Sequence, residues 1–425
     1  MRGDTTLQLF TAKTGRGDRM LDRRSLLKAA ACAAVLPLSG CGLFEQERET
    51  ASAQAKFLTL CDLATEELNK EIKPFQLGNP SSGDAQTHHS AFFVDSYVVR
   101  ALCVAYDITG NNKYLSTCQR WSDRVIALQK LMIPHGAYYM NYGREPGATQ
   151  GDWYVADSGS IAMGILATSI RTSDEHRLRY LRSVQAYAKL VAKSYFGKRG
   201  GISDGIWGQS TDEWWASTAI AGMLFAHFHR ETGCEEHASH ALNAFKWTLL
   251  NGLRNATNPT FEQGPAGVVF YTGEFFAVAL RHGKLTERER DAASPHLEVI
   301  LDWLANNQKG RGATTSVDYL LDSYMAGMPY LMYALAEEWP DAPPTLRSAA
   351  DRELRYITTI LFKNGSPPDL ATILSKTEIP QDRSPDLWGF MSWAMMSYAE
   401  KLSPGALLRT SKEANHPECS VVELE

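Results

Sequence analysis

The chain has 425 residues, of which 44% are hydrophobic and 21% charged, and its formal net charge is −5. A chain of this length buries a substantial core, in one large domain or two medium ones. The mild acidic balance argues against nucleic acid as a partner, since binding it requires clustered Lys and Arg. Ten Trp and seventeen Tyr residues are typical of a sugar-binding cleft, and equally of a large helical core.

The first 41 residues have the pattern of a targeting segment. Residues 22–28, Asp-Arg-Arg-Ser-Leu-Leu-Lys, resemble a twin-arginine export signal with Asp22 in place of the usual hydroxyl residue. The apolar run that follows, 29–38, is too short to span a bilayer as a helix. It ends in Leu-Ser-Gly-Cys, which resembles the lipobox of bacterial lipoproteins. We therefore expect cleavage before Cys41 and acyl chains on Cys41 as the membrane anchor, with an uncleaved signal anchor as the alternative.

The resemblance to lipoproteins also implies a location. Gly42, rather than Asp, follows the lipidated cysteine, which implies sorting to the outer membrane of a Gram-negative cell, facing the periplasm. The polar, acidic stretch 42–54 is typical of a flexible tether. We expect a soluble domain held at the membrane surface by the lipid on Cys41.

The remaining cysteines do not form a metal motif. Five of them lie beyond Cys41, an odd number without a CxxC pair, so we expect no metal and no cofactor. Cys103 and Cys118 either form a disulfide or pack as small apolar residues.

From residue 55 onward the pattern is helical, and a coarse unit recurs along the chain. Each unit opens with aromatic and acidic residues, continues as an apolar helix rich in small residues, and often ends in a charged, amphipathic helix. Such alternation predicts inner helices that are apolar all round and outer helices with one solvated face. The six openings lie at 88–97, 151–159, 211–217, 271–276, 317–324 and 384–390.

Six units predict an all-α fold, an (α/α)6 toroid of six helical hairpins with few or no strands, over residues 55–402. The helix from 55 to about 72 is expected to close the ring against the sixth unit. Residues 403–425 are predicted to form a loosely ordered tail. An open α-solenoid shares the same alternation, but the count of six and the aromatic, acidic openings favour the toroid.

In a toroid the openings gather at one mouth, where acidic side chains have two uses. A carboxylate at a helix start accepts backbone N–H bonds and suits the helix dipole. In an aromatic, partly dry mouth it can also act as a general acid or base, and glycoside hydrolysis usually needs two carboxyl groups. The catalytic candidates are Asp157, which lies among small residues, and then Asp212 and Glu213.

Several other residues of the openings are candidates for substrate binding. An indole face stacks on a pyranose ring, and the alternative for each Trp is core packing. Tyr and Arg together suit a uronate, because Arg pairs with a carboxylate and Tyr can move a proton. The candidates are Trp153, Trp207, Trp214 and Trp215 as platforms, His88 and His89 as a binding pair, and Tyr142 and Arg144 for a uronate.

The fifth unit resembles a known family. Residues 322–331, Asp-Ser-Tyr-Met-Ala-Gly-Met-Pro-Tyr-Leu, are similar to a segment of the unsaturated glucuronyl and rhamnogalacturonyl hydrolases, although Tyr-Met falls one residue early. Those families fold as six-hairpin toroids and use aspartates at inner-helix starts. The resemblance implies a catalytic role for Asp322, with Asp157 or Asp95 as the second carboxyl group.

Three functions agree with these patterns. The first is a glycoside hydrolase that acts on an oligosaccharide or polysaccharide through paired carboxylates. The second is a polysaccharide lyase or epimerase acting on uronate glycans, with Tyr142, Arg144 and a histidine in the active site. The third is a non-catalytic lipoprotein that binds a glycan or a partner during polysaccharide assembly or export.

Overall fold

A computed structural model of the chain describes residues 40–70, 92–140, 153–172, 174–205, 212–251, 253, 264–307, 323–368 and 387–410. Within these residues there are twelve α-helices and one short 3-10 helix, and the only β-structure is a set of isolated bridges. The chain divides into two compact units, Met1–Glu49 and Thr50–Glu425. The second unit is the helical domain considered below.

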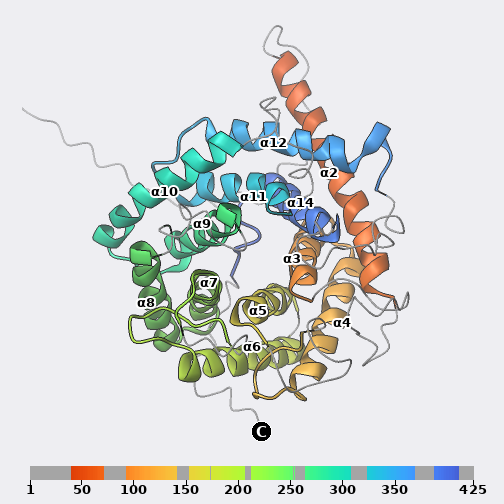
Figure 1. Cartoon of the computed structure of the whole chain (residues 1–425). Coiled ribbons are helices and arrows are strands. Elements are labelled where there is room, and N and C mark those ends of the chain that lie inside the picture. Colours follow the sequence, from red (N-terminus) through yellow and green to blue (C-terminus); the bar gives the residue numbers. More distant parts are fainter. Residues whose placement is uncertain are drawn as a thin grey trace, which may run out of the picture. The chain divides into compact units, whose positions relative to one another are not determined.

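Six helices form the inner ring of this domain (Figure 1). Each contacts two others, and the last contacts the first, so the ring is closed. In order around the ring they are α3 (Phe92–Thr109), α5 (Val155–Ser169), α7 (Trp215–Thr232), α9 (Gly264–His282), α11 (Ser323–Glu338) and α14 (Leu387–Leu402).

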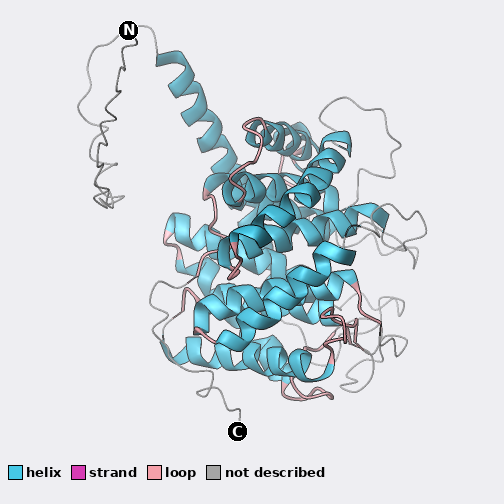
Figure 2. Ribbon diagram, turned by 90° about the vertical axis from the view of Figure 1, so that its left-hand side faces the viewer, coloured by secondary structure: helices cyan, strands magenta, loops and turns pink. Residues whose placement is uncertain are grey.

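Each inner helix is followed or preceded by an outer helix that packs against its outward face. Figure 2 shows helices and loops, with no strand, among the described residues. Residues 50–68 of the N-terminal helix α2 (Gly40–Leu68) serve as the outer helix of α14, and the rings of Phe57 and Tyr398 lie 6.5 Å apart. The prediction of an all-α toroid of six hairpins is confirmed. The other outer helices are α4 (Asn112–Gln129), α6 (Asp174–Ser194), α8 (Glu235–Asn251), α10 (Glu287–Asn307) and α12 (Leu346–Leu361).

The two helix classes follow from their sequences. In α7 all but one of the residues are buried, because outer helices and neighbouring inner helices surround it. Small residues bring the inner helices together: a Cβ on Gly222 would lie 2.4 Å from the ring of Phe275. By contrast, the outer helix α12 buries only one stripe, at helical spacing.

Some predicted boundaries differ in the structure. The fourth opening, 271–276, lies well inside α9, which begins at Gly264, so Glu274 is deep in the ring rather than at its mouth. Residues 42–54, for which composition predicts a tether, are part of α2. Among the described residues, no helix is both long enough and apolar enough to span a membrane.

The first and last inner helices are joined by a buried aspartate. Asp95 of α3 is fully buried and accepts hydrogen bonds from Trp388 Nε1 of α14 at 2.9 Å and Trp121 Nε1 of α4 at 3.4 Å. This contact fixes the point where the ring closes. The buried side chain of Asp95 thus contributes to the fold at this junction.

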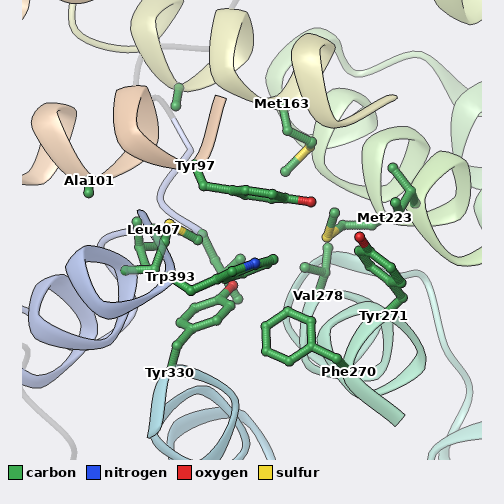
Figure 3. Packing of buried hydrophobic residues seen from close by; sticks show 14 of the residues in the cluster. Tyr97, Ala101, Met163, Met223, Phe270, Tyr271, Val278, Tyr330, Trp393 and Leu407 are labelled. Atoms are coloured by element: carbon green, nitrogen blue, oxygen red, sulfur yellow. The ribbon is translucent and has the colours of Figure 1, made fainter. Parts of the chain in front are cut away.

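Aromatic side chains fill the centre of the ring (Figure 3). The rings of Tyr97 and Trp393 stack at 4.0 Å, and Phe270 meets Trp393 edge-on at 4.2 Å. Met163 and Met223 approach from the opposite side of the centre, and both are buried. These buried side chains come from several inner helices and pack against one another at the centre of the ring.

Composition predicts a loose tail for residues 403–410. In the structure they lie across the C-terminal ends of the inner helices and accept hydrogen bonds from them. His227 Nε2 donates to the carbonyl of Arg409 at 3.0 Å, and His282 Nε2 donates to the carbonyl of Leu408 at 2.6 Å. Arg171 Nη2 donates to the carbonyl of Ala406 at 3.3 Å. This segment closes the end of the ring opposite the mouth.

The two histidines make this closure sensitive to acid. Burial lowers the pKa of His282 to about 4 and that of His227 well below its ordinary value, and nearby arginines add to the effect. The unfolded chain therefore binds more protons below pH 6.5, and stability is lost as the pH falls from there towards 4. For His282 alone, we expect the free energy of unfolding in urea to be about 2 kcal/mol lower at pH 5 than at pH 7.

A His282→Gln variant should have a smaller difference between the two pH values. The matched control is His135→Gln, because His135 is exposed on the loop after α4, and it should keep the full difference. If the free energy of unfolding changed equally with pH in His282→Gln and in the wild type, the loss of stability in acid could not be assigned to His282.

Candidate functional site

The loop that follows α6 positions the starts of two inner helices. Ser203 N–H donates to Tyr195 O at 2.9 Å, which folds residues 195–205 back on themselves. Val155 N–H, at the start of α5, donates to Asp204 O at 3.0 Å, and Trp214 N–H, just before α7, donates to Ile202 O at 2.9 Å. We call residues 195–205 the clamp, because it holds both helix starts.

Glycine is required where the clamp meets α5. Gly205 has φ +105°, a conformation that side chains other than Gly rarely adopt, and a Cβ there would lie 2.7 Å from Trp153 O. Gly205→Ala should lower the free energy of unfolding by about 1–3 kcal/mol, as measured by urea denaturation. The control is Gly233→Ala, where φ is +72° but no atom lies within 4 Å of the added Cβ. An equal loss of unfolding free energy in both variants would show that the close approach of the added Cβ to Trp153 O does not contribute to the loss.

Asp212 is the exposed carboxyl group at the start of α7, two residues before the N-cap residue Trp214. The antiparallel bridge between Ser203 and Glu213 sets it beside Asp204. The indole of Trp214 is half-buried and meets Trp215 edge-on, with ring centroids 5.4 Å apart. Asp212 and Trp214 therefore place a carboxyl group and a partly exposed indole at the start of α7.

Asp204 belongs to the same place but was not among the residues selected from the sequence. Its side chain is half-buried, and its Oδ1 is buried with no hydrogen-bond partner among the described residues. Burial raises the pKa of Asp204, a hydrogen bond from its own backbone N–H partly opposes this rise, and the negative charge of Asp212 adds to it. The structure thus brings together two carboxyl groups whose environments differ.

Asp157, the first catalytic candidate, lies in the first turn of α5 and is half-buried. Burial raises the pKa of Asp157 to about 7. Burial, Tyr138 and the charge of Asp157 all raise the pKa of Tyr187, a residue of the outer helix α6. Asp157 therefore lies near the outer layer as well as near the mouth, and it holds a proton close to neutral pH.

Glu213 has a structural role. Its carboxylate accepts hydrogen bonds from Arg199 N and Arg199 Nε, both at 2.8 Å, and from Trp247 Nε1 at 2.7 Å. These donors outweigh burial and lower the pKa of Glu213. The carboxylate is held in the ionised state between the clamp and α8, which does not suit a proton donor.

The remaining candidates divide into buried and undescribed residues. Trp153 and Trp215 are fully buried, so neither indole presents a face to a ligand in this structure. No group of three potential metal-ligating side chains occurs among the described residues. The other candidates lie outside the described residues: His88, His89, Tyr142, Arg144, Trp207 and Asp322. The same applies to the side chain of Cys41.

The architecture and the mouth define the class: a six-hairpin toroid with carboxyl groups at its inner-helix starts. Three solved structures share this fold. An α-1,6-mannanase variant from Salegentibacter sp. HEL1_6, in complex with α-1,6-mannotriose, is 12% identical, with a TM-score of 0.52 over 83% of this chain and 100% of that one. The Lin0763 protein from Listeria innocua is 14% identical, with a TM-score of 0.53 over 82% and 97%.

The third structure is an α-mannanase from Bacteroides thetaiotaomicron, which is 13% identical, with a TM-score of 0.50 over 81% of this chain and 95% of that one. Neither a protein-family model nor a curated protein matches the chain. At these identities the likeness establishes the six-hairpin fold.

Proposed function

We propose that the chain is an exported glycan-acting enzyme, a glycoside hydrolase whose carboxyl groups lie at the mouth of the toroid. The observation that carries this proposal is the pair Asp204 and Asp212, one half-buried and one exposed, beside a partly open Trp214. Two carboxyl groups in different environments are the requirement of glycoside hydrolysis.

Two of the structures with this fold are named as α-mannanases. In one of them the inactive variant carries asparagine in place of two consecutive aspartates. In this chain, Asp212 and Glu213 are consecutive acidic residues at the start of an inner helix. This parallel supports Asp212 as a catalytic residue and α-mannan oligosaccharides as the first substrates to test.

The location is a second part of the proposal. We propose that the twin-arginine segment directs export and that acyl chains on Cys41 anchor the domain to the outer membrane, facing the periplasm. Mass spectrometry of the membrane fraction should find a lipid on Cys41. A Cys41→Ala variant should appear in the soluble fraction.

The activity is tested with the soluble domain, residues 42–425, incubated with α-1,6-mannotriose, α-mannan, neutral oligosaccharides and uronate oligosaccharides. New reducing ends without a change in absorbance near 235 nm would support the hydrolase. A rise in absorbance would identify a lyase, and a fall would identify an unsaturated uronyl hydrolase. Binding without any product would replace the enzyme by a glycan-binding lipoprotein.

A further inference from the structure

We propose that Asp204, supplied by the clamp, is the proton donor of the mouth and that Asp212 is its ionised partner. This assignment rests on the proposed glycosidase function. Asp204 lies outside the six inner-helix openings, whereas every catalytic candidate predicted from the sequence lies within one of them.

Asp204 is held by its backbone, and its carboxyl group takes a hydrogen bond from its own N–H. Its carbonyl accepts the N–H of Val155, and its neighbours Ser203 and Gly205 form bridges to Glu213 and Tyr154. The clamp is fixed at its other side by Ile202 N–H, which donates to Thr218 Oγ1 at 2.8 Å. A change at the carboxyl group therefore leaves these contacts in place.

The surroundings favour a neutral Asp204. Its Oδ1 is buried with no donor among the described residues, and an ionised oxygen without a donor is costly there. The antiparallel bridge between Ser203 and Glu213 sets the exposed Asp212 beside Asp204, and the negative charge of Asp212 disfavours ionisation of Asp204. The environment of Asp204 therefore favours its protonated form, while part of its side chain stays accessible.

The reaction balances with these two groups. As the glycosidic C–O bond breaks, its electron pair stays on the leaving oxygen, which takes the Asp204 proton and departs as a hydroxyl. Asp212, as the carboxylate, stabilises the positive charge that develops at the anomeric carbon. Water adds to that carbon and releases one proton, which restores the protonated state of Asp204.

The first test needs no substrate. In protein labelled with carbon-13 at the Asp carboxyl groups, the Asp204 signal, assigned from its loss in Asp204→Asn, should titrate above the ordinary range of an aspartate. Its midpoint should fall in Asp212→Asn and stay unchanged in the matched control Asp341→Asn, an exposed residue after α11. A midpoint at or below the ordinary value, or one that Asp212→Asn does not move, would overturn the assignment.

The second test separates proton donation from a structural role. Asp204→Asn should lower kcat on oligosaccharides by about 10²–10⁴-fold, with the thermal midpoint preserved. Activity should be rescued on a nitrophenyl glycoside, whose leaving group needs no proton, and the alkaline limb of the pH–rate profile should disappear. An equal loss on both substrates would overturn the assignment.

The two proposals fail in different ways. If the wild-type protein cleaves no glycan of the panel, the proposed function fails while the titration of Asp204 remains measurable. If the wild type is active but Asp204 titrates low, the function stands and the proton donor lies elsewhere, with Asp157 as the next residue to test.

Discussion

Changing Asp212 to Asn should lower kcat for glycan hydrolysis by about 10²–10⁴-fold, which is the usual contribution of a positioned carboxyl catalyst. The amide has nearly the same size but carries no charge, so it cannot stabilise positive charge at the anomeric carbon. Because Asp212 is exposed, the free energy of unfolding should change by less than about 0.5 kcal/mol. The measurement compares steady-state kinetics with urea denaturation for the same variant.

The neighbouring acid provides the sharpest comparison for this result. Glu213→Gln keeps the shape of the side chain but weakens three hydrogen bonds to Arg199 and Trp247. It should lower stability more than kcat, which is the reverse of Asp212→Asn. If Glu213→Gln lowers kcat more than stability and Asp212→Asn lowers stability more than kcat, then Glu213 is the catalytic acid and Asp212 supports the fold.

The contrast between Asp212 and Glu213 shows how much of the site could be predicted from the sequence. It identified Asp212 and Glu213 as one pair, because adjacent acids at a helix start look alike in sequence. Their roles separate only through Arg199 and Trp247, which are distant in the chain and reach Glu213 through the clamp. Likewise, Trp153 and Trp214 precede equivalent inner helices, but one is fully buried and the other half-buried.

The fold was more predictable than the site, for a physical reason. Whether a helix is apolar all round or along one stripe is a local property of the sequence, and it distinguished inner from outer helices. The fourth opening was misplaced because Glu274 interrupts an apolar helix and looks like a helix start. Its partner is Arg100, 174 residues away, and periodicity within one helix carries no information about such a contact.

Arg100 and Glu274 cross the centre of the ring. Arg100 belongs to α3 and Glu274 to α9, which lies opposite α3 in the ring order (Figure 1). Arg100 Nη2 lies 3.0 Å from Glu274 Oε1, and Tyr330 OH of α11 donates to the same oxygen at 2.7 Å. Both charged side chains are almost fully buried, at 1% and 2% exposure. Against the effect of burial, Glu274 raises the pKa of Arg100.

Glu274→Gln should therefore lower the free energy of unfolding by about 3–5 kcal/mol, because it leaves the Arg100 charge buried without a counter-charge. Urea denaturation at pH 7 measures the loss. The control is Glu337→Gln, which breaks the exposed pair with Arg347 and should cost at most about 1 kcal/mol. The double variant Arg100→Met, Glu274→Leu should recover most of the loss, because it removes both charges together.

A small loss of unfolding free energy in Glu274→Gln would bear on where the active site lies. It would show that water solvates Arg100, and hence that the layer of Tyr97, Phe270 and Trp393 does not seal the centre. A glycan could then enter between the inner helices, and the active site would extend to Arg100. A large loss supports a dry centre, in which the glycan meets the protein only at the mouth, beside Asp204 and Asp212.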